Sequence, residues 1–180
     1  MIKLEDIRGW NFCDWESFPR NKKGHDGLIK KLKEMVFSVY RLKLVDWNEE
    51  LRKEASIAEK HGRRLWYYVA HKPDLVINVG TSKKDRIFIE YVNTLGRGRS
   101  NFLRDLRGML ALSIAIKKCR GFVLAIRHSD YAECQPTALP KNSPVEIMSL
   151  KSLFFALDKQ DYDYLVGRQE GKNDAYRVQD

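Results

Sequence analysis

The sequence predicts one α/β domain, a mixed sheet of four to five strands with helices on both faces. Helical and strand patterns alternate along the chain of 180 residues. Some stretches repeat apolar residues at the 3.6-residue period of an α-helix, and others are short runs of β-branched and aromatic residues, which are typical of strands. One helical stretch, 101–118, separates the third strand from the fourth. That is enough chain for a crossover, which places these two strands parallel and adjacent.

Four stretches space their apolar residues as helices do: 26–44, 47–61, 101–118 and 149–158. Asp26 is expected at the start of the first helix, where a carboxylate interacts favourably with the helix dipole. In the second helix, Asp46 and Glu49 have the spacing of a capping box, and Gly62 suits the position after its end. The third helix is apolar around most of its circumference, so we expect it to be largely buried.

Five short runs are predicted as strands: 65–70, 74–79, 86–93, 122–127 and the short 145–148. The polar residues 80–85 form a turn that joins the second and third runs in an antiparallel hairpin. Residues 128–145 are interrupted by prolines and are predicted to be a loop. We expect a single domain over 1–180. Its core spans about 47–127, after an aromatic arm and helix (1–46) and before a C-terminal elaboration (128–180).

Two acids stand inside the apolar strands of this hairpin. A turn centred on 80–85 pairs positions whose numbers sum to about 164, which sets Asp74 opposite Glu90 on the same face of the sheet. Buried carboxylates are costly unless something pairs with them. A divalent cation with oxygen ligands would do so, which makes Asp74 and Glu90 candidate metal ligands. The alternative is that each acid touches water at a strand end or pairs with an arginine.

The composition favours a partner that carries phosphate. The net charge is +9 at neutral pH, which suits nucleic acid but would also suit an acidic protein or a membrane surface. No apolar run approaches the roughly 18 residues of a membrane span, and the N-terminus lacks the apolar core of a signal peptide. The three cysteines are far apart and are expected to be free thiols. We therefore expect a cytoplasmic protein that does not enter a membrane.

Arginines cluster where the third helix begins. Arg97 and Arg99 lie in a glycine-rich loop just before the helix, and Arg104 and Arg107 lie in its first turns. Exposed amides, the positive end of the helix dipole and arginine side chains together can bind a phosphate. The alternative is a solvated basic loop.

The chain resembles the PD-(D/E)xK nuclease superfamily, which includes restriction endonucleases and junction and repair nucleases. The resemblance rests on Pro73-Asp74, which opens the second strand, and on Glu90-Tyr91-Val92 in the third. The order of elements over 47–127 also follows the restriction-endonuclease-like core, α-β-β-β-α-β. The resemblance implies Mg²⁺-dependent hydrolysis of phosphodiester bonds, with Mn²⁺ able to substitute. Asp74 and Glu90 would hold the ion, and Glu54, on the helix before the first strand, would reach it.

One position departs from the family motif. The family's lysine falls on Val92, which cannot donate to a phosphate. Lys72 pairs with position 92 in the register above and is our candidate for the missing cation. The resemblance further places Arg97, Arg99 and Arg104 on the side of the active site, where they would contact DNA. Asn93 would contact the substrate or the waters of the ion.

These observations lead to three hypotheses. The first is a metal-dependent DNA endonuclease of type II restriction type, working as a homodimer because cutting both strands takes two active sites. A structure-specific nuclease of junction or repair type is a variant of it. The second is a nucleic-acid-binding protein on the same fold that has lost catalysis, for which Val92 is the argument. The third is a basic α/β adaptor in which Asp74 and Glu90 are structural.

Overall fold

The chain forms a five-stranded open sheet with helices on both faces. The computed structural model describes residues 18–47, 72–134 and 143–168. The strand order follows the sequence, β1-β2-β3-β4-β5. The strands are β1 (Lys43–Leu44), β2 (Leu75–Asn78), β3 (Arg86–Val92), β4 (Gly121–Ile126) and β5 (Val145–Ser149). β1, β2 and β3 are antiparallel, whereas β3, β4 and β5 are parallel. The predicted mixed α/β architecture is confirmed.

The hairpin of β2 and β3 has the predicted register. Leu75 pairs with Ile89 and Asn78 with Arg86. The turn that sets this register is built by a short 3₁₀ helix, η2 (Lys83–Asp85), with a capping box at its start. The Asp85 carboxylate accepts hydrogen bonds from the backbone N–H and the hydroxyl of Ser82, both at 2.9 Å, and these bonds lower its pKa. Local turn chemistry therefore decides which residues of the two strands face each other.

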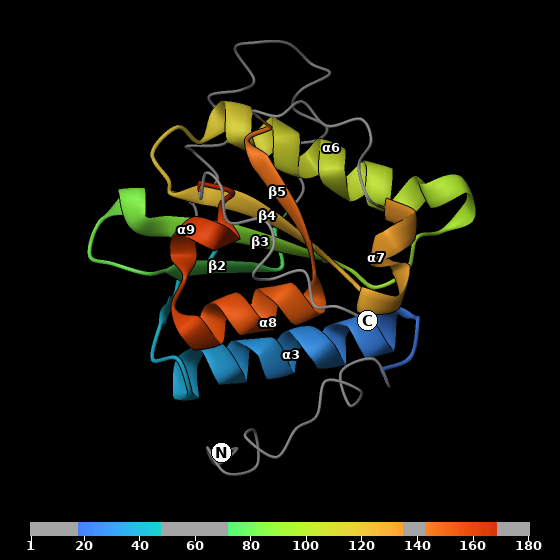
Figure 1. The fold of residues 1–180 in the computed structure, drawn as a ribbon, viewed down its shortest axis with the longest axis horizontal. Coiled ribbons are helices and arrows are strands. Elements are labelled where there is room, and N and C mark those ends of the chain that lie inside the picture. The colour runs from blue at the N-terminus through green and yellow to red at the C-terminus, as the bar shows by residue number, and fades with distance from the viewer. Residues whose placement is uncertain (1–17, 48–71, 135–142, 169–180) are drawn as a thin grey trace.

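Two hydrophobic layers enclose the sheet (Figure 1). The helices α3 (Lys22–Ser38) and α8 (Leu150–Lys159) cover one face, and α6 (Ser100–Ala115) covers the other. Strand alternation sorts the side chains between the layers. In β3, Ile87, Ile89 and Tyr91 face α3 and α8, whereas Phe88 and Val92 face α6. The crossover through α6 places β3 beside β4 in parallel, as predicted.

Side-chain caps start the two helices on the α3 face. The Asn21 side chain accepts a hydrogen bond from the backbone N–H of Gly24 at 2.9 Å at the start of α3. At the start of α8, the Ser149 hydroxyl accepts one from the N–H of Ser152 at 3.1 Å. Such caps satisfy amides that have no partner within the helix. The α3 cap has a consequence for the candidate site, because it fixes where the first turn of α3 begins.

Three local predictions differ from the structure. The first helix, predicted over 26–44, begins earlier and ends at Ser38, and residues 43–44 form the edge strand β1. The predicted loop 128–145 begins instead with a helix, α7 (His128–Cys134). A further short helix, α9 (Tyr162–Leu165), follows α8. The predicted helix 47–61 and strand 65–70 lie outside the described residues. The sheet also extends beyond the predicted core 47–127, since β1 and β5 belong to it.

None of the helices in the described part of the chain has the length and apolar character needed to cross a bilayer. Its most apolar elements are instead the central strands, which are buried between the two helical layers.

Candidate functional site

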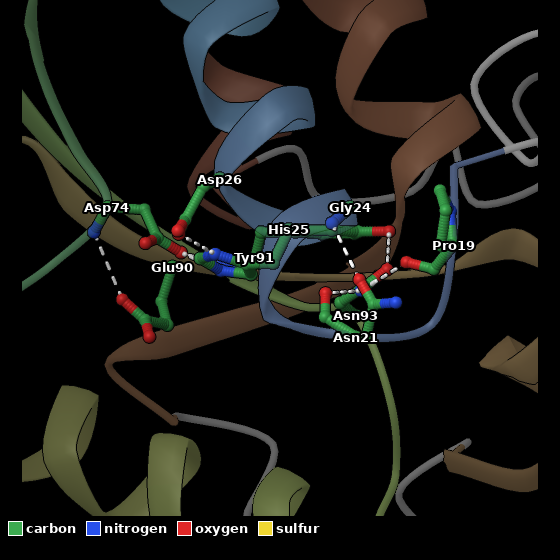
Figure 2. Close-up of polar contacts among 9 residues, drawn as sticks. All are labelled: Pro19, Asn21, Gly24, His25, Asp26, Asp74, Glu90, Tyr91 and Asn93. Carbon is green, nitrogen blue, oxygen red and sulfur yellow. Dashed lines mark hydrogen bonds and ion pairs between the residues drawn. The ribbon is translucent and has the colours of Figure 1, made fainter.

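Asp74 and Glu90 are neighbours at the end of the β2–β3 hairpin, with Asp74 just before β2 and Glu90 in β3. The backbone N–H of Asp74 donates to Glu90 Oε2 at 3.1 Å. The backbone N–H of Tyr91 donates to Asp74 Oδ2 at 2.9 Å. Beyond Leu75 and Ile89, the two segments are therefore joined by these two hydrogen bonds from backbone N–H groups to carboxylates (Figure 2). The two acids are thus neighbours across the hairpin, and each helps to hold the segment that carries the other.

A histidine from a distant part of the chain completes this arrangement. His25, in the first turns of α3, places Nε2 3.3 Å from Asp74 Oδ2 and Nδ1 3.4 Å from Asp26 Oδ1. Its ring stacks on Tyr91, with centroids 5.8 Å apart and planes inclined by 19°. The hydrogen bond to Asp74 is the main cause that raises the pKa of His25 from 6.5 to about 9, while burial opposes the shift. The imidazole is therefore protonated at neutral pH.

Asn93 holds the segment that leads into α3. Its side-chain amide donates to the backbone carbonyls of Pro19 and Asn21, each at 3.0 Å (Figure 2). Asn93 is only 5% exposed, so its amide group is used inside the fold. Gly24 lies directly against this segment, because a Cβ at Gly24 would collide with the carbonyl group of Pro19. The end of β3 thereby positions the first turn of α3, which carries His25.

The same segment is also attached to β4 and α7. The guanidinium of the buried Arg127, just after β4, donates to the carbonyl of Phe18. Arg20 forms an ion pair of 2.9 Å with Asp130 and a hydrogen bond of 3.1 Å to Ser129, both in α7. The carboxyl ends of β3 and β4 and the helix α7 therefore converge on residues 18–20.

Charges from α6 reach the other side of the acid pair. Arg104 is exposed and pairs with the buried Asp105 at 2.8 Å. This hydrogen bond, with the nearby negative charges of Asp105 and Glu90, raises the pKa of Arg104. Arg97 and Arg99 are exposed in the loop before α6, where Arg99 adopts a left-handed backbone conformation with φ of 63°. Arg104, one of the predicted DNA-contacting arginines, thus lies within electrostatic range of Glu90.

The remaining predicted residues are placed differently. Val92 is 2% exposed and packs in the layer under α6, so the motif's lysine position is inside the hydrophobic core. Lys72 is exposed ahead of β2. Asn93 lies at the site but faces the backbone of residues 19–21, as described above. Glu54 lies outside the described residues.

The candidate ligands for a divalent cation are the carboxylates of Asp74 and Glu90. Within residues 18–47, 72–134 and 143–168 there is no group of three or more His, Cys, Asp or Glu side chains that could hold a metal ion. A magnesium ion, however, is usually bound through one or two carboxylates together with waters and substrate phosphates. In the same residues, hydrogen bonds reach the Asp74 carboxylate at Oδ2 alone, which leaves Oδ1 for a further partner. Among the described residues, Asp74 and Glu90 therefore supply the two carboxylates that a magnesium site of this open kind uses.

Sequence analysis missed His25 and the structural use of Asn93. The predicted first helix begins at residue 26, although Asn21 is also a residue that favours helix starts. That signal would have moved the predicted start of the first helix to an earlier residue and placed His25 in its first turns. It would not have placed His25 beside Asp74, which is 49 residues away in the chain.

Comparisons with protein-family models, with curated proteins and with solved structures find no match.

Proposed function

We propose that this chain is a metal-dependent DNA endonuclease, with Mg²⁺ held by Asp74 and Glu90. The observation that carries the proposal is that Asp74 and Glu90 are neighbours at the end of the hairpin, where the backbone N–H of Asp74 donates to the Glu90 carboxylate and that of Tyr91 donates to the Asp74 carboxylate. When bound, the ion would polarise a scissile phosphate and lower the pKa of an attacking water. The residues of the chain orient the two carboxylates and supply positive charge around them.

The order of the elements supports the restriction-endonuclease-like form of this proposal. Among the described residues, helix α3, the antiparallel strands β1, β2 and β3, helix α6 and the parallel strand β4 occur in the order α-β-β-β-α-β. Residues 48–71, between β1 and β2, lie outside the described part of the chain. Asp74 lies just before β2 and Glu90 lies in β3, which is the placement that the motif would require.

Positive charge near the acid pair supports nucleic acid as the substrate. Arg97 and Arg99 are exposed before α6, and Arg104 interacts electrostatically with Glu90. The net charge of +9 would favour association with a polyanion. Two copies of the chain would be needed to cut both strands of a duplex, so we propose a homodimer acting on DNA. A type II restriction enzyme and a structure-specific nuclease are both compatible with this site.

A cleavage assay tests the proposal. Mixed plasmid and phage DNA is incubated with the full chain in Mg²⁺, Mn²⁺ or EDTA, at low and moderate salt. We expect cleavage that requires metal and falls at least about 10²-fold in Asp74→Ala and in Glu90→Ala, since each removes a ligand of the only proposed ion. Asp158→Ala, an exposed acid on α8, is the matched control and should cut as the wild type does. Cleavage that persists in either site variant, with the fold intact by circular dichroism, would disprove the assignment.

Two observations favour a second candidate, a DNA-binding protein without catalysis. Val92 is buried where the motif requires a lysine, and the carboxylate of Asp74 already interacts with His25. This candidate predicts DNA retardation that weakens steeply with salt and needs no metal, and no cleavage in any of the three buffers. Replacing both Arg97 and Arg99 by Gln should then reduce the salt dependence. Replacing both Lys83 and Lys84 by Gln, in the exposed turn at the other end of the hairpin, is the charge-matched control.

A further inference from the structure

We propose that His25 is a positioning residue for the Asp74 carboxylate, so that the first turns of α3 set the geometry of the acid pair. This inference rests on the proposed function, because it concerns the metal site formed by Asp74 and Glu90. It also identifies the role of a residue that the motif does not contain.

The backbone of β3 constrains the Asp74 side chain only weakly. This residue precedes the first residue of β2, so no ladder hydrogen bond from β3 reaches its backbone N–H, which donates instead to Glu90. Its carboxylate is half of the proposed metal site, yet one backbone N–H, that of Tyr91, is a weak constraint on a side chain with two rotatable bonds. His25 supplies a second donor to the same oxygen, Oδ2. Two donors on Oδ2 hold the carboxylate plane and keep Oδ1 available for a metal ion.

The imidazole is itself fixed in place. The ring of Tyr91 stacks against it, and the backbone N–H of the same tyrosine holds Asp74. Asp74, His25 and Tyr91 thus form a closed set of contacts in which each member touches the other two (Figure 2). The side chain of His25 is 25% exposed and that of Asp74 is 15% exposed, so these two residues lie at the margin of the core, against the buried Tyr91.

The position of His25 depends in turn on the end of β3. Asn93, two residues after Tyr91, anchors the carbonyls of Pro19 and Asn21, and Asn21 caps α3. One strand end therefore controls both partners of Asp74: Tyr91 directly and His25 through the cap of α3. Supporting contacts of this kind are needed when the ligands of a site come from separate elements and must be held to within a fraction of an ångström.

The test compares three uncharged replacements in the full chain, with Mn²⁺ binding measured by electron paramagnetic resonance. His25→Gln keeps an N–H near the position of Nε2, within reach of Asp74. His25→Phe keeps the stack on Tyr91 but has no donor, and His25→Asn has a donor near the position of Nδ1 that does not reach Asp74. All three variants lack the charge, and His25→Gln and His25→Asn both lack the ring, so the difference between these two reports the hydrogen bond, while His25→Phe shows whether the stack alone suffices.

We expect His25→Phe and His25→Asn to bind Mn²⁺ about fivefold more weakly than His25→Gln, the change that corresponds to one ordinary hydrogen bond. In the cleavage assay, the same two variants should need more metal for half-maximal rate, while the rate at saturating metal stays within about twofold. The metal concentration that His25→Gln needs for half-maximal rate should be closer to that of the wild type than the concentration needed by His25→Phe or His25→Asn. If His25→Phe fails to fold, the comparison of His25→Asn with His25→Gln makes the same test.

Equal Mn²⁺ affinities in the Gln, Phe and Asn variants would overturn the positioning role while leaving the proposed metal site intact. A wild-type chain that binds no Mn²⁺, or whose Mn²⁺ binding is unchanged in Asp74→Ala and Glu90→Ala, would overturn the proposed metal site, and this inference with it. The two failures are therefore distinguishable in one titration series.

Discussion

Replacing His25 by glutamine should make the stability of the protein less dependent on pH. The contact with Asp74 raises the pKa of His25 from 6.5 to about 9 in the folded chain. A group whose pKa is higher in the folded state binds protons more tightly there, so protonation stabilises the fold. This contribution is complete below about pH 6.5, declines between pH 6.5 and 9, and is absent above the folded pKa. His25→Gln removes it at every pH.

The size of the effect follows from the shift and from the geometry. A shift from 6.5 to about 9 corresponds to at most about 3 kcal/mol, at 1.36 kcal/mol per pKa unit. The His25 side chain is 25% exposed and lies 3.3 Å from Asp74 and 3.4 Å from Asp26, which is longer than a strong charge-assisted hydrogen bond. Solvent screening therefore lowers the expected value to about 1–2 kcal/mol.

Urea unfolding at pH 6 and at pH 9.5 measures this contribution, with the wild type and His25→Gln compared at each pH. Subtracting the variant from the wild type removes the titration of groups that both proteins share. We expect the free energy of unfolding of the wild type to exceed that of His25→Gln by about 1–2 kcal/mol more at pH 6 than at pH 9.5. In an Asp74→Asn background this pH-dependent part should shrink, because the main partner of the imidazolium is gone. A wild-type advantage that is the same at both pH values would refute the ion pair.

Three further predictions concern the surroundings of His25 and the motif position. Asn93→Leu should lower the free energy of unfolding by about 1–3 kcal/mol, measured in urea, because the backbone carbonyls of Pro19 and Asn21 lose the donor that the buried Asn93 supplies. Val92→Lys, which restores the motif, should destabilise the protein by about 2–4 kcal/mol, since it puts an ammonium group into the layer under α6. An unchanged melting temperature in this variant would mean that position 92 can reach solvent. Gly24→Ala should cost about 1–3 kcal/mol through collision with Pro19. Gly27→Ala, in the same helix, meets only the edge of a ring and should be neutral or stabilising by up to about 1 kcal/mol, so equal melting temperatures for the two glycine variants would contradict the close packing at Gly24.

The hairpin that carries the acid pair was predictable because its determinants are local. Ser82 and Asp85 form a capping box within the turn, and the turn sets the register of the strands it joins. Once Leu75 faces Ile89, the next opposed positions along the hairpin are Asp74 and Glu90. The parallel pairing of β3 and β4 was predictable for a related reason, because a helix between two strands of one sheet favours a parallel crossover.

The ends of the elements were predicted less well, because packing and capping decide them. Apolar spacing continues past Ser38, yet α3 stops there and residues 43–44 pair with β2 as an edge strand. The segment after β4 was expected to be a loop, but α7 begins at His128, where Asp130 receives the ion pair from Arg20. A helix of this length has little intrinsic stability, so tertiary contacts of this kind decide whether it forms.

The sequence alone determined the layered α/β architecture and the opposition of Asp74 and Glu90, because hydrophobic periodicity and turn chemistry act over a few residues. The tertiary structure decided what surrounds the acid pair. His25 reaches Asp74 across 49 positions of sequence, and Asn93 reaches Pro19 across 74. Side-chain contacts at such separations depend on how the helices dock on the sheet, and many different docking arrangements would bury the same apolar stripe. The local pattern thus specified the acid pair, and the packing of α3 against the sheet specified its partner.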